Sequence, residues 1–392
     1  MKARQWRDGL LALVAVCVAC DGAVDLGDRG PRESPVDDDA SETPTDDPYW
    51  VKTERVTSLG QVTATGALAA SGDFIYVAGT ADGGKHGLYR CKRLDCLTTF
   101  ERLPTIVDYL YSLQVHDGRL AVAAGFSSMF LASYALPDVN DPHVVIGDLP
   151  AFQQVSARFY RNAVYWPLES DAKYYRCALP TCGAGPFRML QENGAGPISG
   201  DGDLVFFSMN GLILRIGALG DGPVERLLPD ATLSVASPVT GSPGDSSGAP
   251  RDLATFLTTS AGMLYASVRH IDCQGPCLTS IFRWPVEGGA GEELVSADTE
   301  VGSLFVFDGE LVWSERDSEH VGGAVLASCR IDNCGATRRH LGIVRFVPFA
   351  RQDQIVFADK RLYWLGATRG DQDIYSITAI RSAPHLTAPR GG

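Results

Sequence analysis

Cysteine is the residue type whose spacing carries the clearest chemical signal in this sequence. Two of the ten cysteines lie within the first twenty residues, and the other eight form four local pairs: Cys91/Cys96, Cys177/Cys182, Cys273/Cys277 and Cys329/Cys334. Each pair falls at or near a predicted turn between two strands, where facing residues have Cα atoms about 4.5–5.5 Å apart, as a disulfide requires. An even number of cysteines behind a secretory signal favours disulfides. Zinc is the alternative, but its C-x2-C pairs must meet in space, and these pairs lie on separate repeat units.

Other residues that could do chemistry give weaker patterns. The string Gly244-Asp245-Ser246-Ser247-Gly248 matches G-x-S-x-G. A nucleophile elbow needs a strand before it and a helix after it, whereas this string lies between Pro243 and Pro250 with no helix following. We therefore predict no catalytic role for Ser246.

Histidines and aspartates also lack a recognisable ligand pattern. The seven histidines occur singly: His86, His116, His143, His270, His320, His340 and His385. The segments 138–141 and 371–373 could offer carboxylate oxygens to calcium, but neither has the spaced ligands of an EF-hand loop, and Asp-rich turns are common in hairpins. We predict no catalytic residues, no metal site and no cofactor.

The N-terminus is typical of a secretory signal. Lys2, Arg4 and Arg7 precede an apolar stretch over residues 10–19, which is too short to span a bilayer. The ending Cys17-Val18-Ala19-Cys20 resembles the lipobox of bacterial lipoproteins, which implies that residues 1–19 are removed and that Cys20 is acylated (palmitate among its acyl chains). Lipidation of Cys17, or an ordinary signal peptide, are the alternatives.

Residues 20–48 are predicted to be a disordered tether. Residues 21–48 hold ten acidic and two basic residues, together with four prolines, a composition that cannot bury enough surface to fold. The rest of the chain has no basic stripe, which argues against nucleic acid as a partner. The predicted location is the cell envelope, lipid-anchored on the extracytoplasmic side, in the periplasm or on the outer surface.

The remainder of the sequence contains a repeated pattern. A turn pair such as Asp117-Gly118 or Asp308-Gly309 is followed by a short alternating run of apolar residues, and the pattern occurs seven times, beginning at Ile75, Leu120, Val164, Leu204, Leu264, Leu311 and Leu362. The period of two and the enrichment in β-branched and aromatic residues predict strands. Intervals of 40 to 60 residues match four-stranded propeller blades.

We therefore predict an all-β, seven-bladed β-propeller over residues 49–384, built of four-stranded antiparallel blades, with a polar tail at 385–392. The last unit shows only three strands, and residues 50–57 form a strand-like piece without a unit of its own. That piece should complete the last blade and close the ring, because closure removes an exposed edge.

Several second strands, among them Val164-Tyr165-Trp166 and Leu362-Tyr363-Trp364, resemble the Tyr-Trp-Thr-Asp repeats of receptor propellers (YWTD-type). The local cysteine pairs resemble those of exported bacterial propeller lipoproteins. These resemblances imply the architecture and no activity. Tyr76, Trp166, Trp313 and Trp364 are expected to pack between neighbouring blades.

The resulting functional hypothesis is a membrane-anchored exported lipoprotein whose propeller is a non-catalytic binding or scaffolding module. Its partners would be the membrane, through the anchor, and an unknown protein or glycan on the propeller face. The alternative is an exported propeller hydrolase or lactonase with calcium at the central channel. The stretches expected to line the channel carry almost no carboxylates or histidines: Val62–Ala69, Ser112–Val115, Phe152–Ala157, Leu253–Thr258 and Gly302–Phe307. This favours binding, because an enzyme needs titratable groups that converge on a pocket.

Overall fold

Short strands joined by tight turns make up the described part of the protein, and the turns follow from the sequence. In a computed structural model, both central residues of the turns Asp117-Gly118 and Asp308-Gly309 have positive φ angles, between 45° and 80°. This is the conformation of the type I′ turn, which matches the twist of a two-stranded hairpin and favours Asp-Gly. Each such turn joins the first strand of a sheet to the second.

The structure describes residues 53–59, 63–81, 85–104, 110–125, 128–150, 157–168, 173–179, 182, 187–190, 198–209, 212–218, 223–227, 232–233, 235–236, 252–270, 279–297, 299–316, 323–345, 355–369 and 375–386. The chain divides into two units, 1–42 and 43–392, and every described residue belongs to the second. The predicted signal peptide (1–19) and the whole of the predicted tether (20–48) lie outside the described residues, and so do Cys17 and Cys20.

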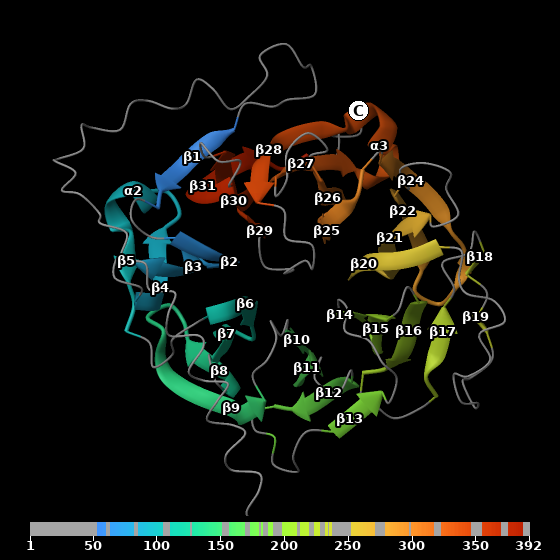
Figure 1. The fold of residues 1–392 in the computed structure, drawn as a ribbon, viewed down its shortest axis with the longest axis horizontal. Coiled ribbons are helices and arrows are strands. Elements are labelled where there is room, and N and C mark those ends of the chain that lie inside the picture. The colour runs from blue at the N-terminus through green and yellow to red at the C-terminus, as the bar shows by residue number, and fades with distance from the viewer. Residues whose placement is uncertain are drawn as a thin grey trace, which may run out of the picture. The chain divides into compact units, whose positions relative to one another are not determined.

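Seven sheets arranged as the blades of a ring form this unit (Figure 1). Blade 1 consists of β2 (Thr63–Ser71), β3 (Phe74–Ala81), β4 (Lys85–Lys92) and β5 (Glu101–Arg102). Blade 2 consists of β6 (Leu110–His116), β7 (Arg119–Gly125), β8 (Ser128–Ala135) and β9 (Asn140–Pro150). Blade 3 consists of β10 (Arg158–Tyr160), β11 (Ala163–Leu168), β12 (Lys173–Ala178) and β13 (Phe187–Leu190).

Blades 4 and 5 are joined by a small additional sheet. Blade 4 consists of β14 (Ile198–Asp201), β15 (Leu204–Met209), β16 (Leu212–Gly217), β17 (Glu225–Leu227) and a fifth strand, β19 (Val235–Ala236). Blade 5 consists of β20 (Asp252–Ser260), β21 (Met263–His270), β22 (Thr279–Pro285) and β24 (Glu292–Ala297). The additional sheet pairs β18 (Thr232–Leu233) with β23 (Gly289–Ala290).

Blade 6 is uninterrupted, and blade 7 closes the ring. Blade 6 consists of β25 (Val301–Phe307), β26 (Glu310–Arg316), β27 (Gly323–Arg330) and β28 (Arg339–Arg345). Blade 7 combines β29 (Ile355–Ala358), β30 (Arg361–Arg369) and β31 (Tyr375–Pro384) with β1 (Glu54–Ser58). The predicted closure is confirmed, because β1 pairs antiparallel with β31, Glu54 opposite Ser382.

The outer strand of blade 1 is short and follows a helical turn. The chain first forms α2 (Cys96–Thr99), and β5 is only two residues long. Blade 6 has the same arrangement, with η2 (Ile331–Asn333) followed by α3 (Cys334–Thr337). In both blades the second cysteine of a disulfide, Cys96 or Cys334, is the first residue of the α-helical turn. None of the helices among the described residues is long and apolar enough to cross a bilayer.

The core lies between blades, as predicted for the aromatic residues. Trp166, Trp313 and Trp364 are fully buried and pack against the preceding blade, while Tyr76 packs between blades 1 and 2. Replacing solvent by neighbouring apolar side chains stabilises each blade by about 25 cal/mol per Å² of apolar surface buried.

Tyr76 also makes a hydrogen bond across this interface, its hydroxyl donating to the Pro137 carbonyl at 3.1 Å. Burial raises the pKa of Tyr76 to about 12, with the Arg90 guanidinium acting in the opposite direction. An unfolded tyrosine ionises near pH 10. Between these two values the unfolded chain loses a proton that the folded chain keeps, so the free energy of unfolding falls as pH rises.

We expect this alkaline loss of stability to be shallower in Tyr76→Phe than in the wild type. Urea unfolding at several values between about pH 9 and pH 11.5 measures it, since only the wild type has an ionisable group at position 76. Parallel curves for the two proteins would show that Tyr76 does not contribute. The pKa values of Tyr165, Tyr265 and Tyr363 are raised by burial as well, so a residual slope should remain in the variant.

Candidate functional site

The first candidate site is the central channel, where the innermost strands of the blades meet (Figure 1). A cavity of about 260 Å³ lies there. Its described lining consists mainly of aliphatic and aromatic side chains with two threonines, one glutamine and one arginine: Leu68, Ala69, Ala70, Leu113, Gln114, Val115, Arg158, Thr258, Thr259, Leu304, Phe305, Val306, Phe307, Ile355, Val356 and Phe357. This lining offers apolar contact, hydroxyl groups and one guanidinium.

Sequence reasoning missed the charged member of this lining. The inner strand of blade 3 was expected over Phe152–Ala157, but β10 covers Arg158–Tyr160, and Ala157 lies outside the strand. Residues 152–156 are not among those described. In the other blades, the residues that line the channel come immediately before the turn that follows the inner strand. Applying the same rule to the turn at Arg161 would have placed the inner strand of blade 3 correctly. The prediction began too early in the sequence because Phe152 and Val155 are apolar.

The second candidate site is a groove of about 330 Å³ between blades 2 and 3, here called the blade 2–3 groove. Apolar side chains from both blades and a set of titratable groups line it: His116, Asp117, Arg119, Ala121, Ser133, Asp141, His143, Val145, Phe159 and Leu179. Strand alternation explains the set, because Arg119 and Ala121 lie on the same face of β7, and His143 and Val145 on the same face of β9. The apolar members belong to the core between the two blades.

His116 connects the two sides of the groove. Its Nε2 lies 2.5 Å from the carbonyl oxygen of Arg161, in the turn of blade 3, and 3.3 Å from Oδ2 of Asp117. The ring nitrogen therefore donates to the carbonyl oxygen and lies beside a carboxylate. Asp117 lines the groove, and its side chain is 75% exposed, so its carboxylate is accessible to solvent.

Arg119 is held in place by its neighbours in blade 2. Its Nε donates to Ser133 Oγ at 3.1 Å, and its Nη2 donates to the Asp141 carbonyl at 2.8 Å. Its Nη1 lies 3.4 Å from Asp141 Oδ2. Two carboxylates, one fixed guanidinium and two imidazoles thus surround an apolar floor, an arrangement able to bind a polar ligand that carries an apolar portion.

The residues considered for calcium have other partners. Asp138 Oδ1 lies 3.1 Å from Arg90 Nη1, and Asp141 pairs with Arg119. Within the described parts of the chain, no three His, Cys, Asp or Glu side chains come together as metal ligands. The other two segments singled out in the sequence, 244–248 and 371–373, lie outside the described residues, as does His320.

The remaining histidines are distributed over the ring. His385, the first residue of the predicted polar tail, is 7% exposed, and its Nε2 lies 2.8 Å from the Phe307 carbonyl oxygen. His86 bonds with Thr80 within blade 1, and His340 lies in β28. Of the histidines, the structure brings only His116 and His143 to one groove among the described residues.

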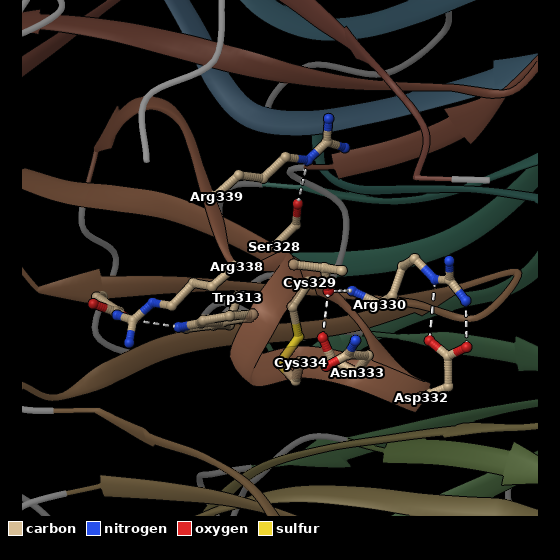
Figure 2. The surroundings of a disulfide bond; sticks show 11 residues. Trp313, Ser328, Cys329, Arg330, Asp332, Asn333, Cys334, Arg338 and Arg339 are labelled. Carbon is tan, nitrogen blue, oxygen red and sulfur yellow. Dashed lines mark hydrogen bonds and ion pairs between the residues drawn. A yellow bond between two sulfur atoms is a disulfide. The ribbon is translucent and has the colours of Figure 1, made fainter. Parts of the chain in front are cut away.

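Three of the four predicted cysteine pairs are disulfides. Cys91–Cys96, Cys177–Cys182 and Cys329–Cys334 have Cα–Cα distances of 4.7, 5.3 and 4.9 Å, while Cys273 and Cys277 lie outside the described residues. Figure 2 shows the third, with Arg330 and Asp332 paired beside it. Arg338 lies over Trp313 on the other side, its guanidinium carbon 5.7 Å from the ring centroid.

Replacing both Cys329 and Cys334 by serine should lower the free energy of unfolding by only about 2 kcal/mol, because the bridge closes a short loop. Equilibrium unfolding in denaturant measures the change, with the wild type under reducing conditions as a second comparison. A loss several times larger would mean that the bridge holds blade 6 to its neighbours rather than fixing one hairpin.

The predicted fourth pair has a direct test. Thiol titration of the denatured, unreduced mature domain should find no free thiol if Cys273 and Cys277 are bonded like the other three pairs. Two free thiols would contradict the prediction.

Comparisons with known proteins confirm the fold. No family model matches the sequence, and no curated protein matches it. Similar solved structures include an oligogalacturonate lyase in complex with manganese, with 14% identity, a TM-score of 0.56, and coverage of 86% of this chain and 96% of the lyase. Another is the WD40 domain of coronin from Toxoplasma gondii, with 12% identity, a TM-score of 0.51, and coverage of 87% and 88%. At such identities the likeness shows the propeller fold alone.

Proposed function

We propose that this protein is an exported lipoprotein, acylated at Cys20, whose propeller is a non-catalytic binding module. The three disulfides support an oxidising, extracytoplasmic location, since such bonds persist outside the reducing cytoplasm. Residues 21–48 act as the tether between the anchor and the ring.

The single observation that carries the binding role is the chemistry of the channel lining. Propellers host both enzymes and binding modules, so the function must be inferred from the chemistry of the site and not from the fold. In the described lining, apolar side chains, threonines and Gln114 surround the one charged group, Arg158. Such a surface binds through shape and hydrogen bonding, whereas acid–base catalysis needs paired titratable groups.

The partner is proposed to bind at the blade 2–3 groove, which combines an apolar floor with a charged rim. A protein loop or a glycan fits this chemistry, because both present apolar patches beside hydroxyl or amide groups. Asp117 is the rim residue best suited to a test, since its carboxylate is exposed and asparagine tolerates the same positive φ angle.

The experiment uses the full chain with a C-terminal tag, cross-linked in membranes and purified. A partner captured by the wild type should be lost or strongly reduced with Asp117→Asn. It should be retained with Asp308→Asn, which changes the equivalent Asp-Gly turn in blade 6. Equal capture of the partner by the wild type and both variants would show that the partner does not bind at the blade 2–3 groove. For a glycan partner, the same three proteins are compared on a glycan array.

The anchor and the alternative function are tested separately. Labelling with radioactive palmitate should be lost in Cys20→Ser and kept in Cys17→Ser, and the reverse result would move the lipid to Cys17. If calcium occupied the channel of a hydrolase, a chelator would lower the melting temperature. We expect no change.

A further inference from the structure

Two leucines of blade 1 are exposed without any role in the core. Leu94 is 94% exposed and Leu97 is 73% exposed, and the only other large hydrophobic residue exposed among the described ones is Val144, at 49%. Single exposed leucines are ordinary in proteins. These two, however, lie three positions apart on the same short loop, which we call the leucine loop (residues 92–99).

The leucine loop is held in a fixed shape. The buried Cys91–Cys96 disulfide closes it. The Lys92 amide donates to Thr99 Oγ1 at 2.8 Å, and the Thr99 hydroxyl donates to the Asp95 carbonyl. The leucines are therefore presented on a rigid support, which reduces the entropy lost when they contact another surface.

Blade 6 contains the same loop without the leucines. There the Arg330 amide donates to Thr337 Oγ1 at 2.9 Å, and the Thr337 hydroxyl donates to the Asn333 carbonyl at 2.7 Å. The spacing from the first cysteine is identical, and Asp332 and Gly335 stand where blade 1 has Leu94 and Leu97. The loop does not need leucine at either position in order to fold, so the leucines serve something outside it.

The leucine loop lies where the N-terminal part of the chain joins the ring. α2 contacts β1, and Arg93, at the base of the loop, pairs with Asp359 in the turn before β30. Arg361, at the start of β30, in turn binds Glu54 Oε2 at 2.6 Å. β1 therefore begins, at Glu54, on the face of the ring that carries the leucine loop.

We propose that Leu94 and Leu97 insert into the bilayer that holds the lipid anchor, so that this face of the ring is turned toward the membrane. The inference rests on the proposed acylation of Cys20. If the proposed tether, residues 21–48, behaves as a flexible chain, its root-mean-square length is about 30 Å, which keeps the ring close to the bilayer. A tethered contact needs little affinity of its own, because the tether raises its effective concentration.

The free energy and the surface area that two leucines can contribute favour the bilayer over a protein as the partner of this loop. Burying one leucine side chain favours the membrane-bound state over the aqueous state by roughly 10- to 100-fold. This gain is too small to recruit a protein from free solution, but it is sufficient for a molecule that is already tethered to the membrane. Two side chains cover far less than the roughly 1,000 Å² that a specific protein interface requires. The charges nearby are balanced, because Arg90 pairs with Glu101, and Arg93 and Arg361 pair with acidic residues of blade 7. Lys92 and Asp95 in the loop itself also offset each other.

The test places the acylated full chain on phosphatidylcholine vesicles whose acyl chains carry bromine, a short-range quencher of tryptophan fluorescence. Leu94→Trp should be quenched by at least about twofold more than Val144→Trp, the matched control on the outer strand of blade 2. The variant Leu94→Asp/Leu97→Gly, which installs the blade 6 residues, should keep the wild-type melting temperature. It should also increase the rate at which a protease cuts the vesicle-bound chain near β1.

The outcomes separate the anchor from the loop. If the wild-type chain does not float with the vesicles, the acylation and the insertion both fail. If it floats and Leu94→Trp is quenched no more than Val144→Trp, the insertion alone is overturned. If quenching is absent and the Leu94→Asp/Leu97→Gly variant loses a co-purifying protein, the loop binds a protein pocket instead, which also overturns the proposal.

Discussion

Replacing Glu310 by glutamine is expected to lower the free energy of unfolding by about 3 kcal/mol or more, the range found when one partner of a buried ion pair is removed. Glu310 is completely buried at the start of β26. Its Oε1 accepts a hydrogen bond from Arg339 Nη2 at 2.7 Å, and its Oε2 accepts one from the Leu386 amide at 2.8 Å. His385 Nε2 lies 3.5 Å from the same Oε2.

The carboxylate is needed because two donors approach two different oxygens. Glutamine supplies one acceptor oxygen, so its NH2 group would face either the Arg339 guanidinium or the Leu386 amide. Arg339 would also be left as a buried cation whose remaining partners are the Pro384 carbonyl at 2.7 Å and Ser328 Oγ at 3.0 Å. An unpaired buried charge is far more costly than an unmade neutral hydrogen bond.

Thermal and denaturant unfolding measure the effect, with Glu101→Gln as the control. Glu101 also binds an arginine, Arg90 at 2.8 Å, but its side chain is 55% exposed. We expect less than about 1 kcal/mol from that substitution, as for other exposed pairs. Similar losses for the two variants would show that the buried network around Glu310 does not fasten the C-terminal residues to blade 6.

Most of the fold could be predicted because its signals are local. The turn Asp308-Gly309 and the alternation in Leu311-Val312-Trp313 each depend on a few consecutive residues, and the structure confirms both the strands and the burial of Trp313. Closure could be predicted by counting, since a last unit with three strands and an unassigned strand at the other end have one simple solution. β1 in blade 7 is that solution.

The candidate sites could not be predicted, because they form between blades. His116 and His143 are 27 positions apart in the sequence, and nothing in their neighbourhoods indicates that strand alternation directs both into one groove with Phe159 of the next blade. The burial of His385 also depends on residues far away in the sequence. Its contacts are with Phe307 and Glu310, more than seventy residues earlier. A polar residue after the last strand is ordinarily exposed, and only the blade 6 contacts explain why this one is not.

Deleting residues 50–57 is expected to have the largest effect of any change considered for this protein. The deletion removes nearly all of β1, so β31 becomes an exposed edge strand in the last blade. It also removes the buried Thr57 and the ion pair between Glu54 and Arg361. We expect a fall in melting temperature of more than about 10 °C or loss of soluble expression, because closure lets each blade pack on two neighbours.

The matched control is a deletion of equal length in the proposed tether, residues 31–38, which should leave the melting temperature unchanged. Differential scanning calorimetry of both purified proteins provides the measurement, and limited proteolysis shows where the ring opens. Cleavage in the closure deletion should begin in blades 7 and 1, which share the interface containing Val56, Leu59 and Ile380. Equal stability of the two deletion proteins would mean that six blades and a three-stranded sheet hold the ring without β1, so β1 would cover an edge without closing the fold.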